Sequence, residues 1–241
     1  MKQPPTVNEA RISEIFSSLQ GEGTHLGERH LFIRFEECHI HCEYCDELDK
    51  PGRTYSLDEV TATVRQLEKD EGPHAFVSFT GGEPLLYQNF LAPLMLRLKA
   101  EGFRTYLETN GILWQALASV IGWCDVIAMD LKPASVTKEK SFLEEHRRFL
   151  ELARAKELFI KIVLSKEIEV REFQDLIQLV GEVAPRTPVI LQPVSTLGEM
   201  EHEGHEDPEL MQLLYELQRM AGHILPEVRI MPRLHRILKV R

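Results

Sequence analysis

Long hydrophobic runs are missing from this 241-residue sequence, and none approaches the roughly 18 apolar residues that a membrane-spanning helix needs. The first residues, MKQPPTVNEARISEIF, have neither the apolar core nor the small-residue cleavage site of a signal peptide. Basic residues are also few, with 28 Lys and Arg against 38 Asp and Glu and a net charge of −10. This deficit disfavours binding to phosphate-rich partners. We therefore expect a cytoplasmic protein that binds neither nucleic acid nor membrane.

Cysteine is scarce as well, because four residues are too few for a disulfide framework. Three of the four fall in the run Cys38-His-Ile-His-Cys42-Glu-Tyr-Cys45, which has the spacing C-x3-C-x2-C. In a reducing compartment such clustering indicates metal or redox chemistry. The fourth residue, Cys124, is remote in sequence, and we expect it to be a buried core residue in a strand.

Short β-branched or aromatic runs alternate with longer amphipathic stretches, a pattern typical of βαβ units and a parallel sheet. The predicted strands are Leu31–Phe35, Ala75–Phe79, Arg104–Glu108, Asp125–Asp130, Phe159–Leu164, Val189–Gln192 and Val228–Met231. About six strand–helix repeats are fewer than the eight of a complete barrel. We therefore predict an α/β fold, a partial (β/α)6 TIM-like barrel, in a single domain spanning residues 1–241.

Three local signals refine this pattern. A capping box of Ser56 and Glu59 marks the start of one helix, and Asp207-Pro208 marks another. The segment Ser195–Asp207, which contains two glycines and several acidic residues, is expected to be a surface loop.

The cysteine cluster follows the predicted strand Leu31–Phe35, so it lies at the carboxyl end of a strand, where parallel α/β folds build active sites. Three closely spaced thiolates can hold three irons of a 4Fe-4S cluster and leave the fourth iron open. An open iron can chelate the methionine moiety of S-adenosylmethionine (SAM), whose reductive cleavage gives a 5′-deoxyadenosyl radical. The alternative is a structural zinc site with His39 or His41 as the fourth ligand.

A second motif, Phe79-Thr80-Gly81-Gly82-Glu83-Pro84, closes the next predicted strand. Its glycines allow a close approach of the backbone to a ligand, and Glu83 can accept a hydrogen bond from an ammonium group. Together with the cysteine spacing, this segment resembles the radical SAM superfamily. In that superfamily the Gly-Gly-Glu-Pro segment contacts the methionyl amine of SAM.

Within the superfamily the sequence most resembles the 7-carboxy-7-deazaguanine synthase family. The resemblance is carried by Glu14-Ile-Phe-Ser-Ser-Leu-Gln-Gly-Glu-Gly23, Phe32-Ile-Arg34, Cys45-Asp46, Glu108-Thr-Asn-Gly111, Leu191-Gln-Pro193 and Val228-Arg-Ile-Met-Pro-Arg-Leu-His235. It implies conversion of 6-carboxy-5,6,7,8-tetrahydropterin to 7-carboxy-7-deazaguanine with loss of ammonia, a step toward queuosine. It also implies Mg2+, an electron donor such as flavodoxin, and a homodimer.

The same resemblance assigns residues to the site. Cys38, Cys42 and Cys45 would hold the cluster. SAM would be contacted by Tyr44, Asp46, Gly82, Glu83, Asp130, Lys132 and Gln192. The pterin would be contacted by Leu19, Gln20, Gly21, Arg34, Thr80 and Thr109, with Glu108 nearby. His235 could also approach the substrate, but a histidine that packs in the core or caps a helix is the favoured interpretation. A planar guanidinium suits the substrate carboxylate, which favours Arg34 for that role, although a surface arginine in an edge strand is the other interpretation.

Two short segments depart from the family pattern. Glu47 stands where the family has a Thr or Ser that ligates Mg2+, and a carboxylate is also a hard oxygen ligand. Glu36-Glu37 replaces the usual Ala-Gly before the first cysteine.

Two other functions stay open at this point. One is a glycyl-radical-enzyme activase, which shares Gly-Gly-Glu-Pro and the segment Asp130-Leu-Lys132, and the other is a zinc-binding interaction module without enzymatic activity.

Overall fold

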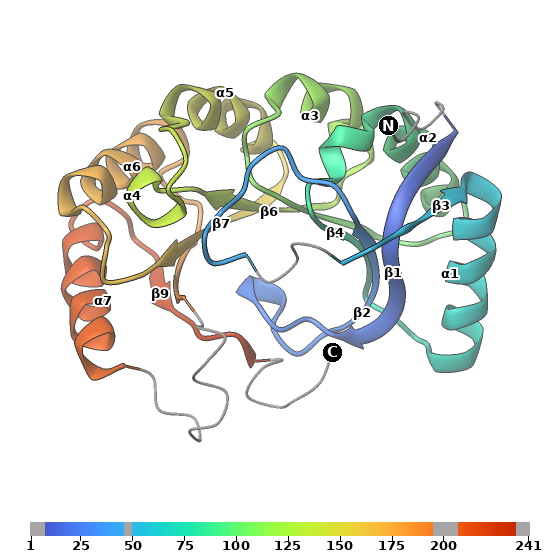
Figure 1. Cartoon of the computed structure of the whole chain (residues 1–241), viewed down its shortest axis with the longest axis horizontal. Helices are drawn as coiled ribbons and strands as arrows, with labels where there is room; N and C mark the ends of the chain where they lie inside the picture. The colour runs from blue at the N-terminus through green and yellow to red at the C-terminus, as the bar shows by residue number, and fades with distance from the viewer. Residues whose placement is uncertain (1–7, 46–49, 195–206, 235–241) are drawn as a thin grey trace.

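One curved sheet of nine strands forms the centre of the computed structural model, which describes residues 8–45, 50–194 and 207–234 (Figure 1). The strand order is β3-β1-β2-β4-β5-β6-β7-β8-β9, with β2 and β4 to β9 parallel and with β1 antiparallel to both β2 and β3. The strands are β1 (Glu9–Leu19), β2 (Arg29–Phe35), β3 (Arg53–Ser56), β4 (Phe76–Gly81), β5 (Thr105–Thr109), β6 (Val126–Leu131), β7 (Glu157–Leu164), β8 (Val189–Pro193) and β9 (Val228–Ile230).

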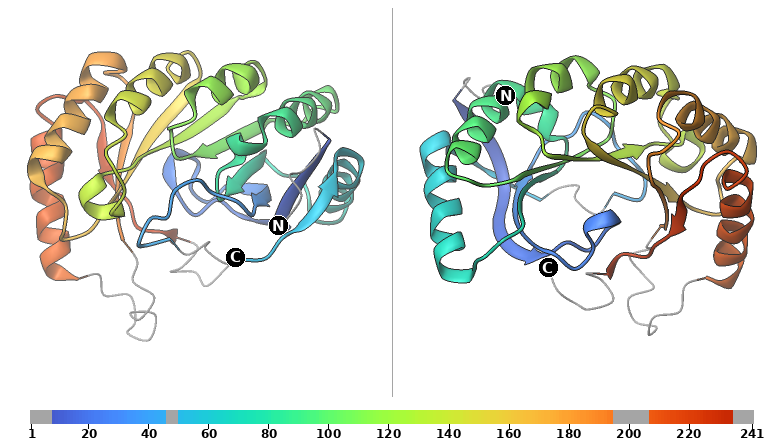
Figure 2. Two further views of the ribbon diagram at one scale, coloured as in Figure 1. Left: turned by 45° about the horizontal axis from the view of Figure 1, so that its top comes forward. Right: turned by 180° about the vertical axis from the view of Figure 1, so that it is seen from behind.

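The longer helices cover the convex face of this sheet, as the views in Figure 2 show. They are α1 (Leu57–Glu71), α2 (Gln88–Ala100), α3 (Trp114–Val120), α5 (Leu143–Ala153), α6 (Val170–Val183) and α7 (Pro208–Ala221), whereas α4 (Ala134–Thr137) is a single turn in the loop after β6. The sheet is open, since β3 and β9 are its two edges and do not pair with each other. Among the described residues, no helix is long and apolar enough to cross a membrane.

The predicted partial barrel is confirmed, and all seven predicted strands are present within about two residues of their predicted ends. The sequence interpretation missed β1 and β3. Polar residues are frequent in both strands, because most of their side chains are only partly buried, and this weakens the alternation that marks a strand. Cys124 is 1% exposed and packs in the main core, as expected. Its predicted place in a strand is wrong, since it ends the short 3-10 helix Ile121–Trp123 just before β6.

Both predicted helix starts are confirmed. The Ser56 hydroxyl accepts from the Glu59 backbone N–H, and the Glu59 carboxylate accepts from the Ser56 N–H at 2.8 Å. The Asp207 carboxylate accepts from the first free N–H groups of α7, which begins at Pro208. The predicted loop upstream, residues 195–206, lies outside the described residues.

The concave face of the sheet is apolar near the amino ends of the strands and polar near their carboxyl ends. Near the amino ends its side chains form a small apolar cluster, which consists of Phe76, Tyr106, Val126, Ala128, Phe159 and Ile190. Side chains alternate between the two faces of a strand, so the residues two or four positions later return to the concave face. Those residues are polar: Thr80, Glu108, Asp130, Lys161 and Gln192. The carboxyl end of the barrel is therefore a polar bowl above an apolar floor.

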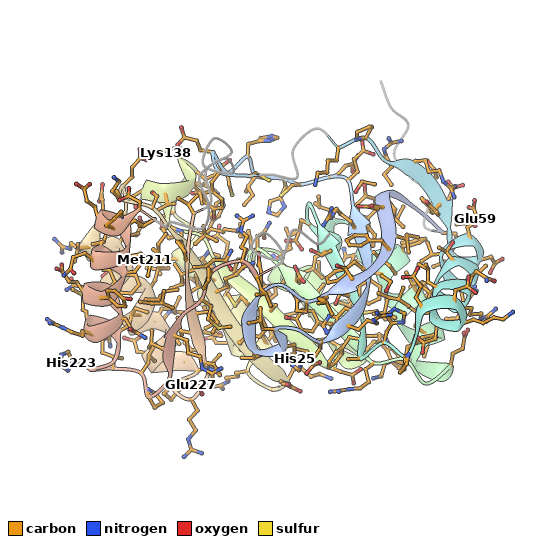
Figure 3. All side chains as sticks on the ribbon, turned by 90° about the horizontal axis from the view of Figure 1, so that it is seen from below. His25, Glu59, Lys138, Met211, His223 and Glu227 are labelled. Atoms are coloured by element: carbon orange, nitrogen blue, oxygen red, sulfur yellow. The ribbon has the colours of Figure 1, made fainter. Side chains whose placement is uncertain are left out.

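The loop between β1 and β2 completes that floor. Its 3-10 helix η1 (Gly23–His25) lies inside the curve of the sheet (Figures 1 and 2), and the His25 ring packs 5.0 Å from the ring of Phe76. Glycine is required at position 23 for two reasons: its φ is +72°, and a Cβ there would overlap the Phe159 ring. Figure 3 shows His25 and Glu227 at the amino end of the strands and Lys138 at the carboxyl end.

Candidate active site

The three clustered cysteines lie in the loop that follows β2. Cys42 is buried, Cys38 and Cys45 are partly buried, and all three thiols are free. They pack around the apolar side chains of Ile40, Ile112 and Phe142. Burial raises the pKa of the Cys38 thiol to about 11 and also raises that of Cys42. The thiols of Cys38 and Cys42 therefore stay protonated at neutral pH until a metal centre replaces their protons.

The described side chains around the cysteine loop do not form a mononuclear metal site in this structure. Within residues 8–45, 50–194 and 207–234, no three His, Cys, Asp or Glu side chains converge on a single metal position. The ligands of a 4Fe-4S cluster need no such convergence, because each thiolate binds a different iron. The donor set of three thiols in one partly apolar loop fits the cluster that the spacing predicts.

The Gly-Gly-Glu-Pro turn after β4 is packed directly against the cysteine loop. Gly82 N–H donates to the Phe35 carbonyl at 2.9 Å, and Glu83 N–H donates to the Glu37 carbonyl at 2.7 Å. A Cβ on Gly81 would overlap the Phe35 backbone, and one on Gly82 would overlap that of Glu37. Both glycines are thus required for the close packing of the turn against the loop that carries the cysteines.

Glu83 is fully buried beneath this turn, with 0% of its surface exposed. Its carboxylate accepts from the Thr109 hydroxyl at 2.9 and 3.1 Å, from Asn110 N–H at 2.8 Å and from Leu85 N–H at 3.1 Å. Burial raises the pKa of Glu83 to about 7 despite these donors. The carboxylate supports the loop after β5, and the direct contact with SAM that the resemblance implies stays a prediction.

Two of the predicted substrate-contacting residues meet at Glu108 in the polar bowl. The Gln20 amide donates to one carboxylate oxygen of Glu108 at 3.0 Å, and the Thr80 hydroxyl donates to the other at 2.8 Å. Burial raises the pKa of Glu108. Arg34 lies opposite Thr80 in the register of β2 and β4, with its guanidinium 5.0 Å above the Phe16 ring and 3.4 Å from the Glu14 carboxylate.

The predicted SAM-contacting residues on β6 and the cysteine loop also come together. Lys132 Nζ donates to the Asp130 carboxylate at 2.8 Å and lies 3.5 Å from the Tyr44 hydroxyl. Burial raises the pKa of Tyr44 to about 12, so its hydroxyl remains neutral. Gln192 is buried on the neighbouring part of the bowl. Its Nε2 donates to Glu22 at 3.3 Å, and its Oε1 has no hydrogen-bond partner among the described residues.

The model of the radical SAM superfamily matches residues 32–180, more than half of this chain. The chain is 37% identical to the 7-carboxy-7-deazaguanine synthase of Geobacter sulfurreducens, over 95% of this chain and 97% of the relative. It is 30% identical to the synthase of Methanopyrus kandleri, over 94% of this chain and 92% of that protein. The chain belongs to the 7-carboxy-7-deazaguanine synthase family. This confirms the resemblance that the sequence motifs indicated.

The fold agrees with this family. The crystal structure of QueE from Escherichia coli superposes with a TM-score of 0.63 at 21% identity, covering 94% of this chain and 95% of that one. Most residues that the family resemblance assigns to the site lie around the carboxyl ends of the strands. Asp46, Glu47 and His235 lie outside the described residues.

Three residues that the sequence analysis missed also line the bowl. Glu22 forms an ion pair with Lys161 of β7 and lies 3.6 Å from Nε of Arg233. Lys161 could have been found from sequence, because it is the one charged residue inside the apolar run Phe-Ile-Lys-Ile-Val-Leu of β7. Glu22 belongs to a motif that was recognised, but no local signal shows that its side chain meets β7.

A fourth missed residue, His146 of α5, bridges two loops of the site. Its Nδ1 lies 3.0 Å from the Gly111 carbonyl, and its Nε2 accepts from Lys132 N–H at 3.2 Å. Burial lowers the pKa of His146 to about 4, so the ring is neutral and its single proton lies on Nδ1. The ring thereby fixes the loop after β5 relative to the end of β6.

Proposed function

We propose that this protein is a 7-carboxy-7-deazaguanine synthase. In this proposal it converts 6-carboxy-5,6,7,8-tetrahydropterin to 7-carboxy-7-deazaguanine, with loss of ammonia. The observation that carries the proposal is the position of a three-cysteine loop beside a bowl of partly buried carboxylates and cations and buried amides at one end of the barrel. A small polar ring with its own carboxylate suits such a bowl, because each of its donors and acceptors needs a partner there.

Cys38, Cys42 and Cys45 would hold the 4Fe-4S cluster, which supplies the electron that cleaves SAM. Tyr44, Asp130 and Lys132 adjoin the cysteine loop and would contact SAM, together with Gly82. Glu83 would act beneath them by holding the loop after β5 in place. The free Oε1 of Gln192 is a buried acceptor that a ligand N–H or O–H would satisfy.

The pterin would lie over Gln20, Thr80 and Glu108. The pyrimidine edge of a pterin presents N–H donors, and a partly buried carboxylate such as Glu108 accepts from them. Arg34 would bind the substrate carboxylate as a bidentate cation. Leu19, Gly21 and Thr109 would also lie beside the pterin, as the family resemblance implies.

Four further parts of the proposal come from the family resemblance or from the sequence. They are Mg2+ with Glu47 among its ligands, a homodimer, a cytoplasmic location and an external electron donor such as flavodoxin. A carboxylate at position 47 is compatible with the octahedral oxygen ligation that Mg2+ prefers. It would also place negative charge beside the substrate carboxylate, which makes a bridging cation more necessary.

The test is an anaerobic assay of protein reconstituted with iron and sulfide, supplied with SAM, a reductant, Mg2+ and 6-carboxytetrahydropterin. The proposal expects 7-carboxy-7-deazaguanine and 5′-deoxyadenosine, identified by mass spectrometry. A protein that assembles a cluster and cleaves SAM but leaves the pterin intact would overturn the substrate and favour an activase. A protein that binds zinc and assembles no cluster would overturn the enzyme class.

A further inference from the structure

Lys161 is the one charged residue within the apolar run of residues 158–164 in strand β7. It lies opposite Asp130 in the parallel register of β6 and β7, and its side chain points into the polar bowl, where 14% of its surface is exposed. Its Nζ is shared between two acids, because it forms an ion pair with Glu22 and lies 3.3 Å from Oδ1 of Asp130. Burial by itself would lower the pKa of Lys161, but Asp130 and Glu22 raise it above its ordinary value, so the ammonium stays charged.

The two acids belong to different halves of the bowl. Glu22 directly follows Gln20 and Gly21, whose loop would contact the pterin, and it also accepts from the Gln192 amide at 3.3 Å. The second oxygen of Asp130 accepts from Lys132 Nζ, which in turn lies 3.5 Å from the Tyr44 hydroxyl in the cysteine loop. Lys161 is therefore an ammonium that joins the pterin half of the bowl to the SAM half, beside the hydrogen bond from Gln192 to Glu22.

We propose that Lys161 is a positioning residue that couples the binding of the two ligands. This inference rests on the proposed function. One ammonium is shared between two carboxylates, each of which also has a second cation nearby, Arg233 for Glu22 and Lys132 for Asp130. A ligand group that draws one carboxylate toward itself therefore changes how strongly the Lys161 ammonium holds the other. SAM is cationic and would act on Asp130, whereas the pterin would act through the loop that carries Glu22. Coupling of this kind is reciprocal, so each ligand changes the affinity for the other by the same factor.

The experiment measures the dissociation constant of SAM by anaerobic equilibrium dialysis, with and without saturating 6-carboxytetrahydropterin. It compares the cluster-loaded wild type with Lys161→Met and Lys161→Gln, which both remove the charge. We expect the pterin to change SAM affinity in the wild type by about fivefold or more, within the range of typical couplings. In Lys161→Met and Lys161→Gln the ratio of the SAM dissociation constants without and with pterin should fall to near one. Lys161→Arg should keep most of the wild-type coupling.

Lys166→Met is the matched control, because Lys166 also joins two acids, Asp207 and Glu209, but on the exposed surface. It should keep the wild-type ratio. Two outcomes would overturn the role of Lys161 and leave the proposed function standing. One is a ratio in Lys161→Met and Lys161→Gln that equals the wild-type ratio. The other is a wild-type ratio of one in a protein that turns over the pterin. Failure of the wild type to bind or convert the pterin overturns the proposed function itself. If Lys161→Met does not fold, Lys161→Gln decides the question alone.

Discussion

The side-chain amide of Asn110 donates a hydrogen bond to Sγ of Cys38 over 3.9 Å. The backbone of Asn110 is held in place as well, because its N–H donates to the buried Glu83 carboxylate at 2.8 Å. The Gly-Gly-Glu-Pro turn and the loop after β5 thus act together on the first cysteine. Hydrogen bonds to ligating sulfur are among the factors that set the reduction potential of an iron–sulfur cluster.

Replacing Asn110 by Ser is expected to lower the reduction potential of the cluster. In the wild type the backbone N–H of Ile112 donates to Asn110 Oδ1 at 3.2 Å. The serine hydroxyl can still accept from this N–H, but the serine side chain is too short to reach the sulfur of Cys38. Loss of one N–H···S bond destabilises the more negative, reduced cluster, by about 30–60 mV for a one-electron couple. Redox titration followed by electron paramagnetic resonance measures this. Asn89→Ser, on the exposed surface of α2, is the control, and equal potentials in the two variants would refute the role of the hydrogen bond.

Alanine at Cys38, Cys42 or Cys45 is expected to abolish cluster assembly, whereas Cys124→Ala should assemble a normal cluster. The three clustered thiols share one loop, while Cys124 lies in the main core, where its loss should cost about 1 kcal/mol of stability. Iron and sulfide analysis with visible absorbance measures assembly, and urea denaturation measures stability. A full cluster in Cys42→Ala would contradict the assignment.

Glu83 should make the stability of the protein depend on pH. Its folded-state pKa of about 7 lies above the ordinary value of 4.5. Between these values the folded state binds the proton and the unfolded state does not, so the free energy of unfolding should fall as pH rises through this window, by up to about 3 kcal/mol. Above pH 7 this contribution no longer changes. The measurement is urea denaturation of cluster-free protein at several pH values.

Glu83→Gln should remove much of that slope, because glutamine does not titrate. Glu144→Gln, at an exposed position of α5, should keep it. The same Glu83→Gln protein is expected to bind SAM less tightly, by roughly 1.5–3 kcal/mol, because it loosens the loop after β5. An equal pH slope in the wild type and Glu83→Gln would show that another group titrates in this window.

Arg34→Lys is expected to weaken pterin binding by roughly tenfold, about 1.4 kcal/mol, and to lower turnover, while SAM binding persists. Lysine keeps the charge but loses the planar fork and its stacking on Phe16. Arg53→Lys is the control, since Arg53 stacks on Tyr55 and pairs with Glu59 at the exposed edge of the sheet. Steady-state kinetics and equilibrium binding test this. Full activity of Arg34→Lys at low pterin concentration would exclude a bidentate role.

The sequence by itself determined the chemistry class and most of the scaffold. The spacing of Cys38, Cys42 and Cys45 limits the metal centre, because close spacing in one loop places three thiols together whatever surrounds them. The alternation of strands with amphipathic helices, the capping box at Ser56 and the cap at Asp207 depend on contacts within a few residues. Such local contacts are readable from the order of residues alone.

Only the tertiary structure decided which side chains share the bowl. Alternation along β7 puts Lys161 on one face, but its meeting with Glu22, 139 positions earlier in the chain, depends on the curvature of the sheet and on the β1–β2 loop filling its floor. The packing around Glu83 was decided in the same way. Its motif indicated a ligand contact, which stays a prediction, and only the packing of β4 against β5 shows that the carboxylate is buried and accepts from Thr109 and Asn110. Burial and long-range pairing depend on the whole fold, and no short segment of sequence encodes them.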